Sequence, residues 1–307
     1  MIYLPAEHPH GGFFLWRYGK MERDILAQIN KDSHKFSKSQ RKISAYISSN
    51  YDKAAFMTAG KLGETVGVSE STVVRFATDL GYDGYPGMRR AMQDMVRNRL
   101  TAVQRIEVAR QQIDGGNLLD TVLSSDIEKL RGTLEEVNKE DFDRAVDKIV
   151  AARTVYIVGM RSSTSLANFM GFYLNLLLDN VRLLHDTSVS EVYEQVFRIR
   201  EDDVFIGISY PRYSSRTIKA MQFAKSAGAT VIGITDGPSS PFVGLADVNL
   251  FAKSDMVSFL DSLVAPMSLI NALIVAIGYR LSDSLSDIFD HLEGIWNQYD
   301  VYEKLGD

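Results

Sequence analysis

Two short segments rich in hydroxyl groups, each with an arginine, are the clearest candidates for chemistry in this sequence. They read GMRSSTS at residues 159–165 and SYPRYSSRT at residues 209–217, and each lies between an apolar run and a helical pattern. Backbone N–H groups at the start of a helix, with hydroxyls beside them, suit an anion such as phosphate. Arginine binds phosphate or carboxylate through two parallel hydrogen bonds. Either segment alone could merely cap a helix, but two at one sheet edge favour a ligand site. The candidate ligand-binding residues are Arg161, Ser162, Ser163, Ser209, Arg212 and Ser214.

The common signatures of nucleotide, metal and covalent chemistry are missing from the sequence. Neither segment matches the phosphate-binding patterns GxxxxGK[ST] or GxGxxG, and no metal-ligand spacing occurs. The chain has no cysteine, which excludes disulfides, thiolate metal sites and thiol nucleophiles. His185 could take part in proton transfer, but a structural hydrogen bond is the favoured interpretation. We therefore expect no cofactor, no metal ion and no catalytic residue.

A second candidate site lies near the N-terminus, in the segment TAGKLGETVGVSESTVVRF at residues 58–76. Its apolar spacing predicts a helix at 59–66, a tight turn at 67–69 and a second helix at 70–80, with Gly67 in the left-handed conformation that ends a helix. In a helix-turn-helix the first residues of the second helix meet base edges in the major groove. These are Ser69, Glu70, Ser71, Thr72 and Arg75. The alternative is an ordinary helical hairpin. On the next helix Arg89, Arg90, Arg97 and Arg99 could contact the DNA backbone.

The elements expected after residue 120 explain how the hydroxyl-rich segments are positioned. Short apolar runs at 154–158, 181–184, 204–208, 230–234 and 248–251 alternate for the most part with helical patterns at 164–178, 190–198 and 215–227. Strands alternating with helices predict right-handed crossovers and a parallel sheet, and continuous apolar runs indicate strands covered on both faces. In such doubly wound sheets ligands bind at the carboxyl ends of the strands, where both segments lie.

Charge divides the chain in the same place. The 307 residues carry a formal net charge of −5, but residues 1–110 hold 17 Lys+Arg against 11 Asp+Glu (+6) and the remainder holds 17 against 28 (−11). A basic first third on an acidic remainder suggests two domains with different partners. Residues 263–279 lack charge, and we interpret them as a core or oligomer-interface helix rather than a membrane span. No secretory signal is seen, and we expect a cytoplasmic protein with no membrane partner.

The predicted fold is an all-α helix-turn-helix domain joined to an α/β domain with a doubly wound, parallel, five-stranded sheet. The expected boundaries are a poorly defined extension at 1–20, a DNA-binding domain at 21–100, a linker at 101–120, a ligand-binding domain at 121–290 and a tail at 291–307. The extension differs from the rest in composition, and Met21 is a candidate start.

The two sites together resemble the RpiR family of transcriptional regulators, which join an N-terminal helix-turn-helix to a C-terminal SIS (sugar isomerase) domain. The resemblance covers roughly residues 30–285. It is carried by GVS at 67–69, TVVRF at 72–76 and LGY at 80–82, then by VGMRSS at 158–163 with Ala167, ISY at 208–210, GA at 228–229, ITD at 234–236, SP at 240–241 and AD at 246–247. It implies a homodimer or homotetramer that binds an inverted-repeat operator in double-stranded DNA and senses a phosphosugar. It also implies that Ser163, Ser209 and Ser214 contact the ligand.

The sequence departs from the commoner SIS pattern in both loops. The pattern Gly-x-Gly-x-Ser has Arg161 at its second glycine, and Ser-x-Ser-Gly-x-Thr has Pro211 and Arg212 in place of Ser-Gly. Our hypothesis is that the arginines read a second anionic group or a sugar acid; ion pairs to Asp186 or Glu191 are the structural alternative. The leading functional prediction is an effector-responsive regulator. A SIS-type sugar-phosphate isomerase and a regulator with a ligand-free SIS dimerisation domain are the competing hypotheses.

Overall fold

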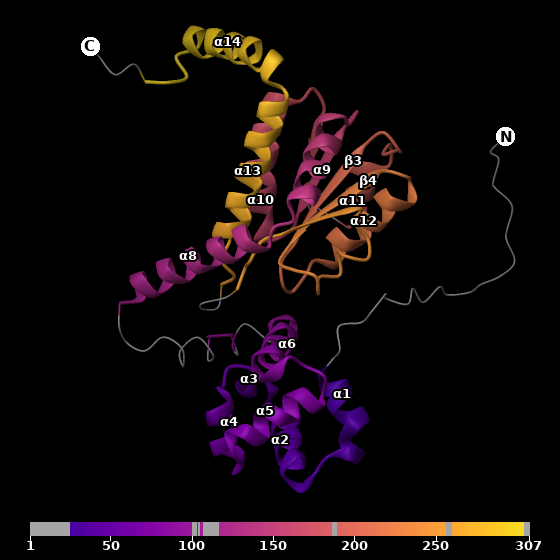
Figure 1. The fold of residues 1–307 in the computed structure, drawn as a ribbon. Coiled ribbons are helices and arrows are strands. Elements are labelled where there is room, and N and C mark those ends of the chain that lie inside the picture. The colour runs from indigo at the N-terminus through magenta and orange to yellow at the C-terminus, as the bar shows by residue number, and fades with distance from the viewer. Residues whose placement is uncertain are drawn as a thin grey trace, which may run out of the picture.

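Two structural regions follow one another along the chain in the computed structural model, a helical region and an α/β region (Figure 1). The structure describes residues 25–99, 103, 105–106, 117–185, 189–255 and 260–303. The extension expected at 1–20 and the candidate start Met21 therefore lie outside the described residues.

The helical region is built around a single apolar core. Its elements are α1 (Ile25–Asp32), η1 (Ser33–Lys35), α2 (Lys38–Ser49), α3 (Tyr51–Ala54), α4 (Ala59–Val66), α5 (Glu70–Asp79) and α6 (Gly84–Arg99). The helix starts follow side-chain capping, because the side chains of Ser37, Thr58 and Ser69 each accept a backbone N–H three residues ahead. The core includes Ile43, Ile47, Leu62 and Phe76, all fully buried.

The α/β region contains a five-stranded, all-parallel sheet in the order β2-β1-β3-β4-β5. The strands are β1 (Val155–Gly159), β2 (Val181–Leu183), β3 (Val204–Ile208), β4 (Thr230–Thr235) and β5 (Val248–Phe251). The helices are α8 (Leu118–Glu136), α9 (Lys139–Val150), α10 (Ser163–Leu177), α11 (Val189–Val196), α12 (Ser215–Ser226), α13 (Val264–Arg280) and α14 (Ser282–Gln298). This confirms the predicted fold class.

Helices cover the sheet on both faces, as the continuous apolar runs predict. Residues of α9, α10 and α13 pack with Val155, Ile157 and Ile206 on one face. Residues of α11 and α12 pack with Tyr156 and Phe205 on the other face. Both central strands β1 and β3 are buried at every position. The carboxyl edge of the sheet is therefore the part of the strands from which loops can reach a ligand.

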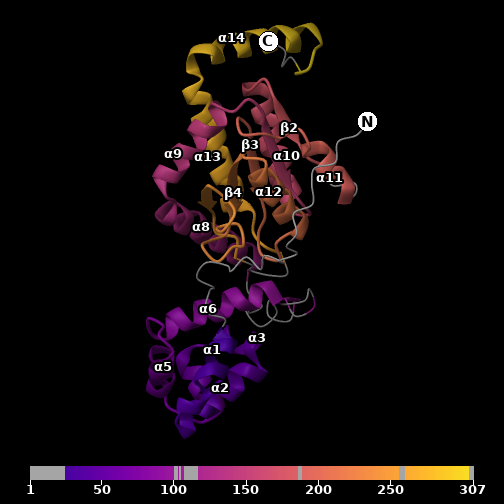
Figure 2. The same cartoon turned by 90° about the vertical axis from the view of Figure 1, so that its right-hand side faces the viewer.

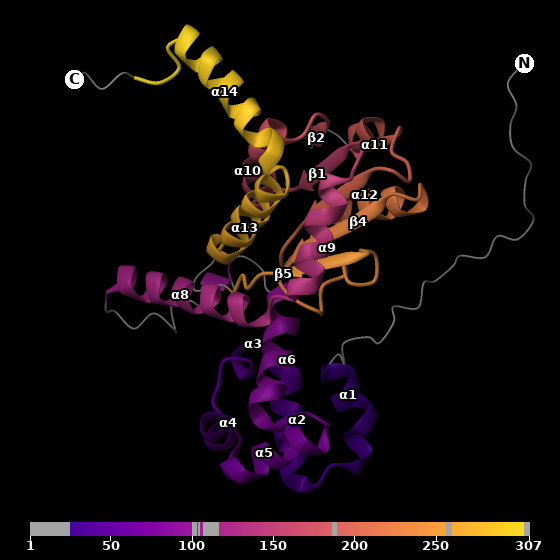
Figure 3. The same ribbon diagram turned by 45° about the horizontal axis from the view of Figure 1, so that its top comes forward.

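Two helices cross the expected domain boundaries, and most of the other elements begin or end within two residues of the expected positions. Helix α8 begins at Leu118, inside the expected linker, because the side chain of Asn117 accepts the backbone N–H of Asp120 and caps the helix. Helix α14 runs through residue 290 and ends at Gln298, within the expected tail. It lies at the far end of the α/β region from the helical region (Figures 1 and 3).

The uncharged segment predicted at 263–279 forms α13, whose inner side chains are buried against α8, α9 and α10. No single helix in the described part of the chain is long and apolar enough to cross a membrane. The bent pair of α13 with residues Leu285–Gln298 meets that test by length and composition, with a bend of 107°.

Helix α6 lies between the other helices of its region and the strand-end loops of the α/β region (Figures 1 and 2). An ion pair lies between the chain that follows α6 and the α/β region. The guanidinium of Arg105, which is 3% exposed, donates to both carboxylate oxygens of Asp261 at 3.0 Å. Asp261 belongs to the segment before α13, which is also held by a 2.6 Å hydrogen bond from the Ser262 hydroxyl to Asp126 of α8. These contacts join the chain that follows α6 to the α/β region.

Candidate functional site

The turn between α4 and α5 has the geometry that the sequence predicts. Gly67 adopts φ 68°, the left-handed conformation that ends α4. Gly63 allows close approach, because a Cβ at this position would lie 2.8 Å from the carbonyl oxygen of Val68. The backbone N–H of Val68 also donates to the carbonyl of Gly63 at 2.9 Å. The two helices are therefore fixed to one another by a turn with little room.

The predicted DNA-binding residues gather at the start of α5 on the outside of the domain. Ser69, Glu70, Ser71 and Arg75 are exposed, and Thr72 is half-buried. The Ser69 hydroxyl caps the helix and lies 2.9 Å from the Ser71 hydroxyl and 2.8 Å from that of Thr72. The opposite face of α5 is fixed in the core through Val73, Phe76 and Ala77. The arrangement presents three hydroxyls and one guanidinium on a rigid helix.

The arginines of α6 lie in different surroundings. Arg89 is half-buried, and its Nε has no hydrogen-bond partner among the described residues. The sequence suggested that Arg90 contacts the DNA backbone. In the structure Arg90 is exposed and lines a cleft against the α/β region. The side chains of Arg97 and Arg99 lie outside the described part of the structure.

The loop after β1 brings its backbone against the strand end. A Cβ on Gly159 would lie 2.3 Å from the carbonyl oxygen of Ser163, so only glycine permits this approach. The Thr164 hydroxyl donates to the carbonyl of Gly159 at 2.9 Å. Ser162 is exposed and forms no side-chain cap to α10, whereas Ser163 is 3% exposed.

The loop after β3 lies directly beside the first, because Gly159 of β1 and Ile208 of β3 are partners in the sheet register. The hydroxyl of Ser209, which is 4% exposed, accepts the backbone N–H of Ser214 at 3.1 Å. The Ser214 hydroxyl in turn accepts the N–H of Thr217 at 3.3 Å and caps α12. Both hydroxyls thus support the loop, and each can still donate its own hydrogen to an anion.

Both predicted arginines adopt left-handed backbone conformations. Arg161 has φ 58° and Arg212 has φ 65°; the other described non-glycine residue with positive φ is Asp300. Left-handed geometry costs a residue with a Cβ about 1–2 kcal/mol. Both side chains are exposed. The loops therefore keep the backbone shape that suits the glycines of the commoner pattern and add a guanidinium at each position.

Three residues that sequence reasoning missed complete this edge of the sheet. The Tyr213 hydroxyl donates to the carboxylate of Asp236, at the end of β4, at 2.8 Å. The Tyr210 ring is 5% exposed, and its hydroxyl has no partner among the described residues. Burial, with a smaller contribution from the charge of Asp236, holds the pKa of Tyr210 well above its usual value. The Tyr210 hydroxyl is therefore neutral near pH 7 and able to donate.

A polar cleft adjoins these loops, between α6 and the ends of β4 and β5. Its volume is about 330 Å³. The lining residues are Arg90, Gln93, Asp236, Gly237, Pro238, Ser239, Lys253, Ser254 and Asp255.

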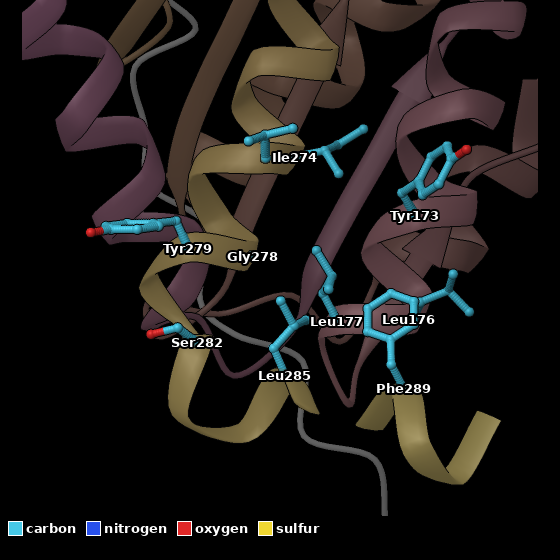
Figure 4. Close-up of a pocket in the computed structure, with 10 residues that line it drawn as sticks. Tyr173, Leu176, Leu177, Ile274, Gly278, Tyr279, Ser282, Leu285 and Phe289 are labelled. Atoms are coloured by element: carbon cyan, nitrogen blue, oxygen red, sulfur yellow. The ribbon is translucent and has the colours of Figure 1, made fainter. Parts of the chain in front are cut away.

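An apolar groove lies at the other end of the α/β region (Figure 4), with a volume of about 390 Å³. Helices α10 and α13 form its walls, and Leu285 and Phe289 of α14 close one end. Val275 and Tyr279, which line it, are 64% and 80% exposed, and the neighbouring Phe172 is 64% exposed. Exposed apolar groups gathered in one place are typical of an interaction surface.

The remaining polar candidates from the sequence are His185 and Asp186. The backbone of His185 exchanges two 3.0 Å hydrogen bonds with the Gln195 side chain, and the ring is exposed. Asp186 lies outside the described residues. Among the described residues, no three His, Asp or Glu side chains form a group that could hold a metal ion.

Comparison with known proteins identifies both regions. Residues 23–99 match the helix-turn-helix domain of the rpiR family, and residues 148–276 match the SIS domain. The HTH-type transcriptional regulator HexR of Pseudomonas aeruginosa is 24% identical over 266 residues, which is 84% of this chain and 90% of HexR.

Two solved structures share the fold. The sugar isomerase domain of an RpiR transcription factor from Sphaerobacter thermophilus is 29% identical, with a TM-score of 0.55, over 57% of this chain and 98% of that one. The NanR protein of Vibrio vulnificus, solved with ManNAc-6P, is 20% identical, with a TM-score of 0.54, over 88% of this chain and 98% of that one.

Proposed function

Because the chain belongs to the rpiR family of helix-turn-helix proteins with a SIS domain, and its relatives are DNA-binding regulators, we propose that its SIS domain senses a phosphosugar or a related anionic sugar derivative. Binding of this effector then changes the affinity of the helix-turn-helix for its operator. The observation that carries the proposal is the pair of adjoining loops after β1 and β3, each with buried and exposed hydroxyls and an arginine.

The ligand-binding residues proposed are Arg161, Ser162, Ser163, Ser209, Arg212 and Ser214. The two loops each precede a helix start, at Ser163 and Ser215, so backbone N–H groups and the helix dipoles favour an anion there. Arg161 and Arg212 supply the charge for a phosphate, and for a carboxylate where the effector is a sugar acid. The NanR protein, solved with ManNAc-6P, supports the class of ligand.

The DNA-binding residues proposed are Ser69, Glu70, Ser71, Thr72 and Arg75. A helix-turn-helix reads one half-site, so an inverted-repeat operator requires two copies related by a twofold axis. We propose that the copies associate through the groove formed by α10, α13 and α14. Its lining is almost entirely apolar and includes the exposed Val275 and Tyr279, whereas a standard interface buries about 800 Å² per partner. The exposed side of α14 can supply the rest.

The central experiment measures operator binding and effector binding on the same protein. An operator duplex is selected from random DNA by the purified full chain, and its affinity is measured by fluorescence anisotropy. Thermal shifts are then measured with glucose 6-phosphate, N-acetylmannosamine 6-phosphate, 6-phosphogluconate and unphosphorylated gluconate. An effector raises the melting temperature by mass action and changes operator affinity.

We expect Arg75→Ala to weaken operator binding by roughly 5- to 150-fold, because a good arginine–base or arginine–phosphate contact contributes about 1–3 kcal/mol. The same variant keeps the thermal shift given by the effector. Wild-type DNA affinity in this variant would contradict the assignment of α5 as the recognition helix.

Two other results would replace the proposal. Turnover of an aldose phosphate to a ketose phosphate, followed by NMR, would show a SIS-type isomerase. No thermal shift with any of the four compounds, together with intact operator binding, would favour a SIS domain that serves for dimerisation alone.

A further inference from the structure

The polar cleft between α6 and the strand ends is formed by both regions of the chain. Arg90 and Gln93 of α6 line one side, and the loops after β4 and β5 line the other. Ligands of doubly wound sheets bind outside the carboxyl ends of the strands where the strand order reverses, here between β1 and β3. The cleft lies along the same edge, at the ends of β4 and β5. Its volume of about 330 Å³ lies at the lower end of the range of ligand pockets.

The cleft is joined to the loops proposed to bind the effector. Asp236 lines the cleft, and its carboxylate accepts the 2.8 Å hydrogen bond from Tyr213. Tyr213 lies in the chain between Arg212 and Ser214, two of the proposed effector contacts. Because β3 and β4 are neighbours in the sheet, the cleft and the loops after β1 and β3 lie along the same edge of the sheet.

One side chain of the lining lacks a hydrogen-bond partner among the described residues. Ser254 is 1% exposed, and its hydroxyl oxygen is fully buried. A buried hydroxyl without a partner is costly, so Ser254 gains a hydrogen bond if its side chain turns toward a polar group bound in the cleft that it lines. The remainder of the lining supplies two cations (Arg90 and Lys253), two carboxylates and an amide. This set suits a polyhydroxylated anion, since guanidinium and ammonium bind the anionic group while carboxylates accept from hydroxyls.

We propose that the effector site extends into this cleft, so that Arg90 and Gln93 of the DNA-binding domain bind the same phosphorylated sugar derivative as the loops after β1 and β3. The inference rests on the proposed function. Arg90 takes the anionic group that projects beyond the β3 loop, and Ser254 and Asp236 bind hydroxyls of the sugar.

Such a shared site links the two functions directly. A ligand that touches both domains binds most tightly when α6 lies against the strand ends, so it favours that arrangement over any other. The orientation of the helix-turn-helix relative to the SIS domain then depends on the effector. By reciprocity, DNA that favours a different orientation weakens effector binding by the same factor.

The test compares Arg90→Gln with the wild-type full chain. The probe is whichever of the four compounds gives a thermal shift with the wild type. Calorimetry is expected to show at least a tenfold loss of affinity for it, because a charge-assisted contact is removed. The factor by which the probe changes operator affinity is expected to fall toward one. The matched control is Arg198→Gln, since Arg198 is exposed, follows α11 and is not among the residues that line the cleft; it should bind the probe as the wild type does.

The outcomes separate the two proposals. If the wild type binds none of the compounds, the proposed function fails. If the wild type binds a compound and Arg90→Gln binds it within twofold with the same effect on operator affinity, the shared site is wrong and the proposed function stands. Should Arg90→Gln lower the melting temperature of the ligand-free protein by more than a few degrees, Ser254→Ala, on the other side of the cleft, is tested in its place. Probe affinity within twofold of the wild type, with the same effect on operator affinity, would again show that the shared site is wrong.

Discussion

At the scale of single residues, the most informative feature is that Arg161 and Arg212 hold φ values of 58° and 65°. Glycine adopts this conformation at little cost, whereas a residue with a Cβ loses about 1–2 kcal/mol. Backbone strain of this kind concentrates at ligand-binding and active sites. The two arginines lie at the ends of adjoining strands, where the proposed effector binds.

Replacing each arginine by glycine separates the effect of backbone strain on stability from the effect of the guanidinium charge on effector affinity. In Arg161→Gly and Arg212→Gly the left-handed strain is relieved, but the unfolded chain gains about 0.4–1 kcal/mol of entropy. We expect the free energy of unfolding to change by less than about 1 kcal/mol in either direction. Affinity for the effector should fall at least tenfold, because charge-assisted hydrogen bonds contribute about 1.5–3 kcal/mol.

Arg161→Ala and Arg212→Ala are the matched controls, since they remove the same charge but keep the Cβ and its strain. They should lose the same affinity as the glycine variants and be the less stable of each pair. Full effector affinity in all four variants would contradict the role given to the guanidinium groups.

The residues of the site differ in how far the sequence reveals them. Ser163, Ser209 and Ser214 were expected at strand ends because apolar runs mark the strands and hydroxyls follow them. The hydrogen bond between Tyr213 and Asp236 was not expected, since the two residues follow different strands and no spacing connects them before the sheet order is known. Arg161 and Arg212 were named as candidates from the sequence, but their left-handed conformation was not predicted, because positive φ is unusual for a residue with a side chain.

At the scale of elements, the position of α5 depends on the close contact between α4 and the turn that follows it. The backbone of Gly63 lies so near Val68 that a Cβ would be 2.8 Å from its carbonyl oxygen. Gly60, on the same helix, would bring a Cβ within 3.3 Å of the flexible Glu70 carboxylate. A Cβ at Gly63 would therefore meet backbone, whereas a Cβ at Gly60 would meet only a flexible side chain, and both glycines lie on α4.

We expect Gly63→Ala to destabilise the helix-turn-helix by about 1–3 kcal/mol, the usual cost of overpacking, in spite of the higher helix propensity of alanine. Gly60→Ala should be neutral or stabilising by up to about 1 kcal/mol, because it gains propensity without a backbone clash. Urea unfolding followed by far-UV circular dichroism measures both. Equal stability of the two variants would show that the turn has more room than the structure indicates.

The elements themselves were predictable where apolar pattern and capping agree. The helix at 59–66 and the strands at 204–208 and 248–251 have the bounds expected from sequence. The expected linker ran to residue 120, three residues past the Asn117 cap of α8, because that cap was overlooked. Residues 291–298 were expected to belong to a tail, whereas they form the last two turns of α14.

At the scale of the whole molecule, the groove between α10, α13 and α14 is the surface on which assembly is proposed. Val275 is 64% exposed in its lining, on a helix whose other side is in the core. We expect the wild type to be at least a dimer by light scattering at micromolar concentration. Val275→Glu should shift it to the monomer, because the interface would have to bury an unpaired carboxylate.

Val243→Glu is the control for that experiment, since Val243 is 40% exposed and lies in the loop before β5. It should leave the mass unchanged. A wild type that is monomeric at tens of micromolar, or a Val275→Glu protein with wild-type mass, would place the association elsewhere. A variant that light scattering shows to be monomeric should also have a lower affinity for the operator, because one half-site would be bound without the other.

The strand at one edge of the sheet, β2, has only three residues and includes the exposed Arg182. A short edge strand offers few unpaired backbone groups, and a charged side chain on it discourages pairing with another strand. The sheet of one copy therefore does not extend into the sheet of the next at that edge. This protects a doubly wound domain, whose strands are otherwise strongly apolar, from edge-to-edge aggregation, and it leaves the helical surfaces as the places where copies can meet in a defined number.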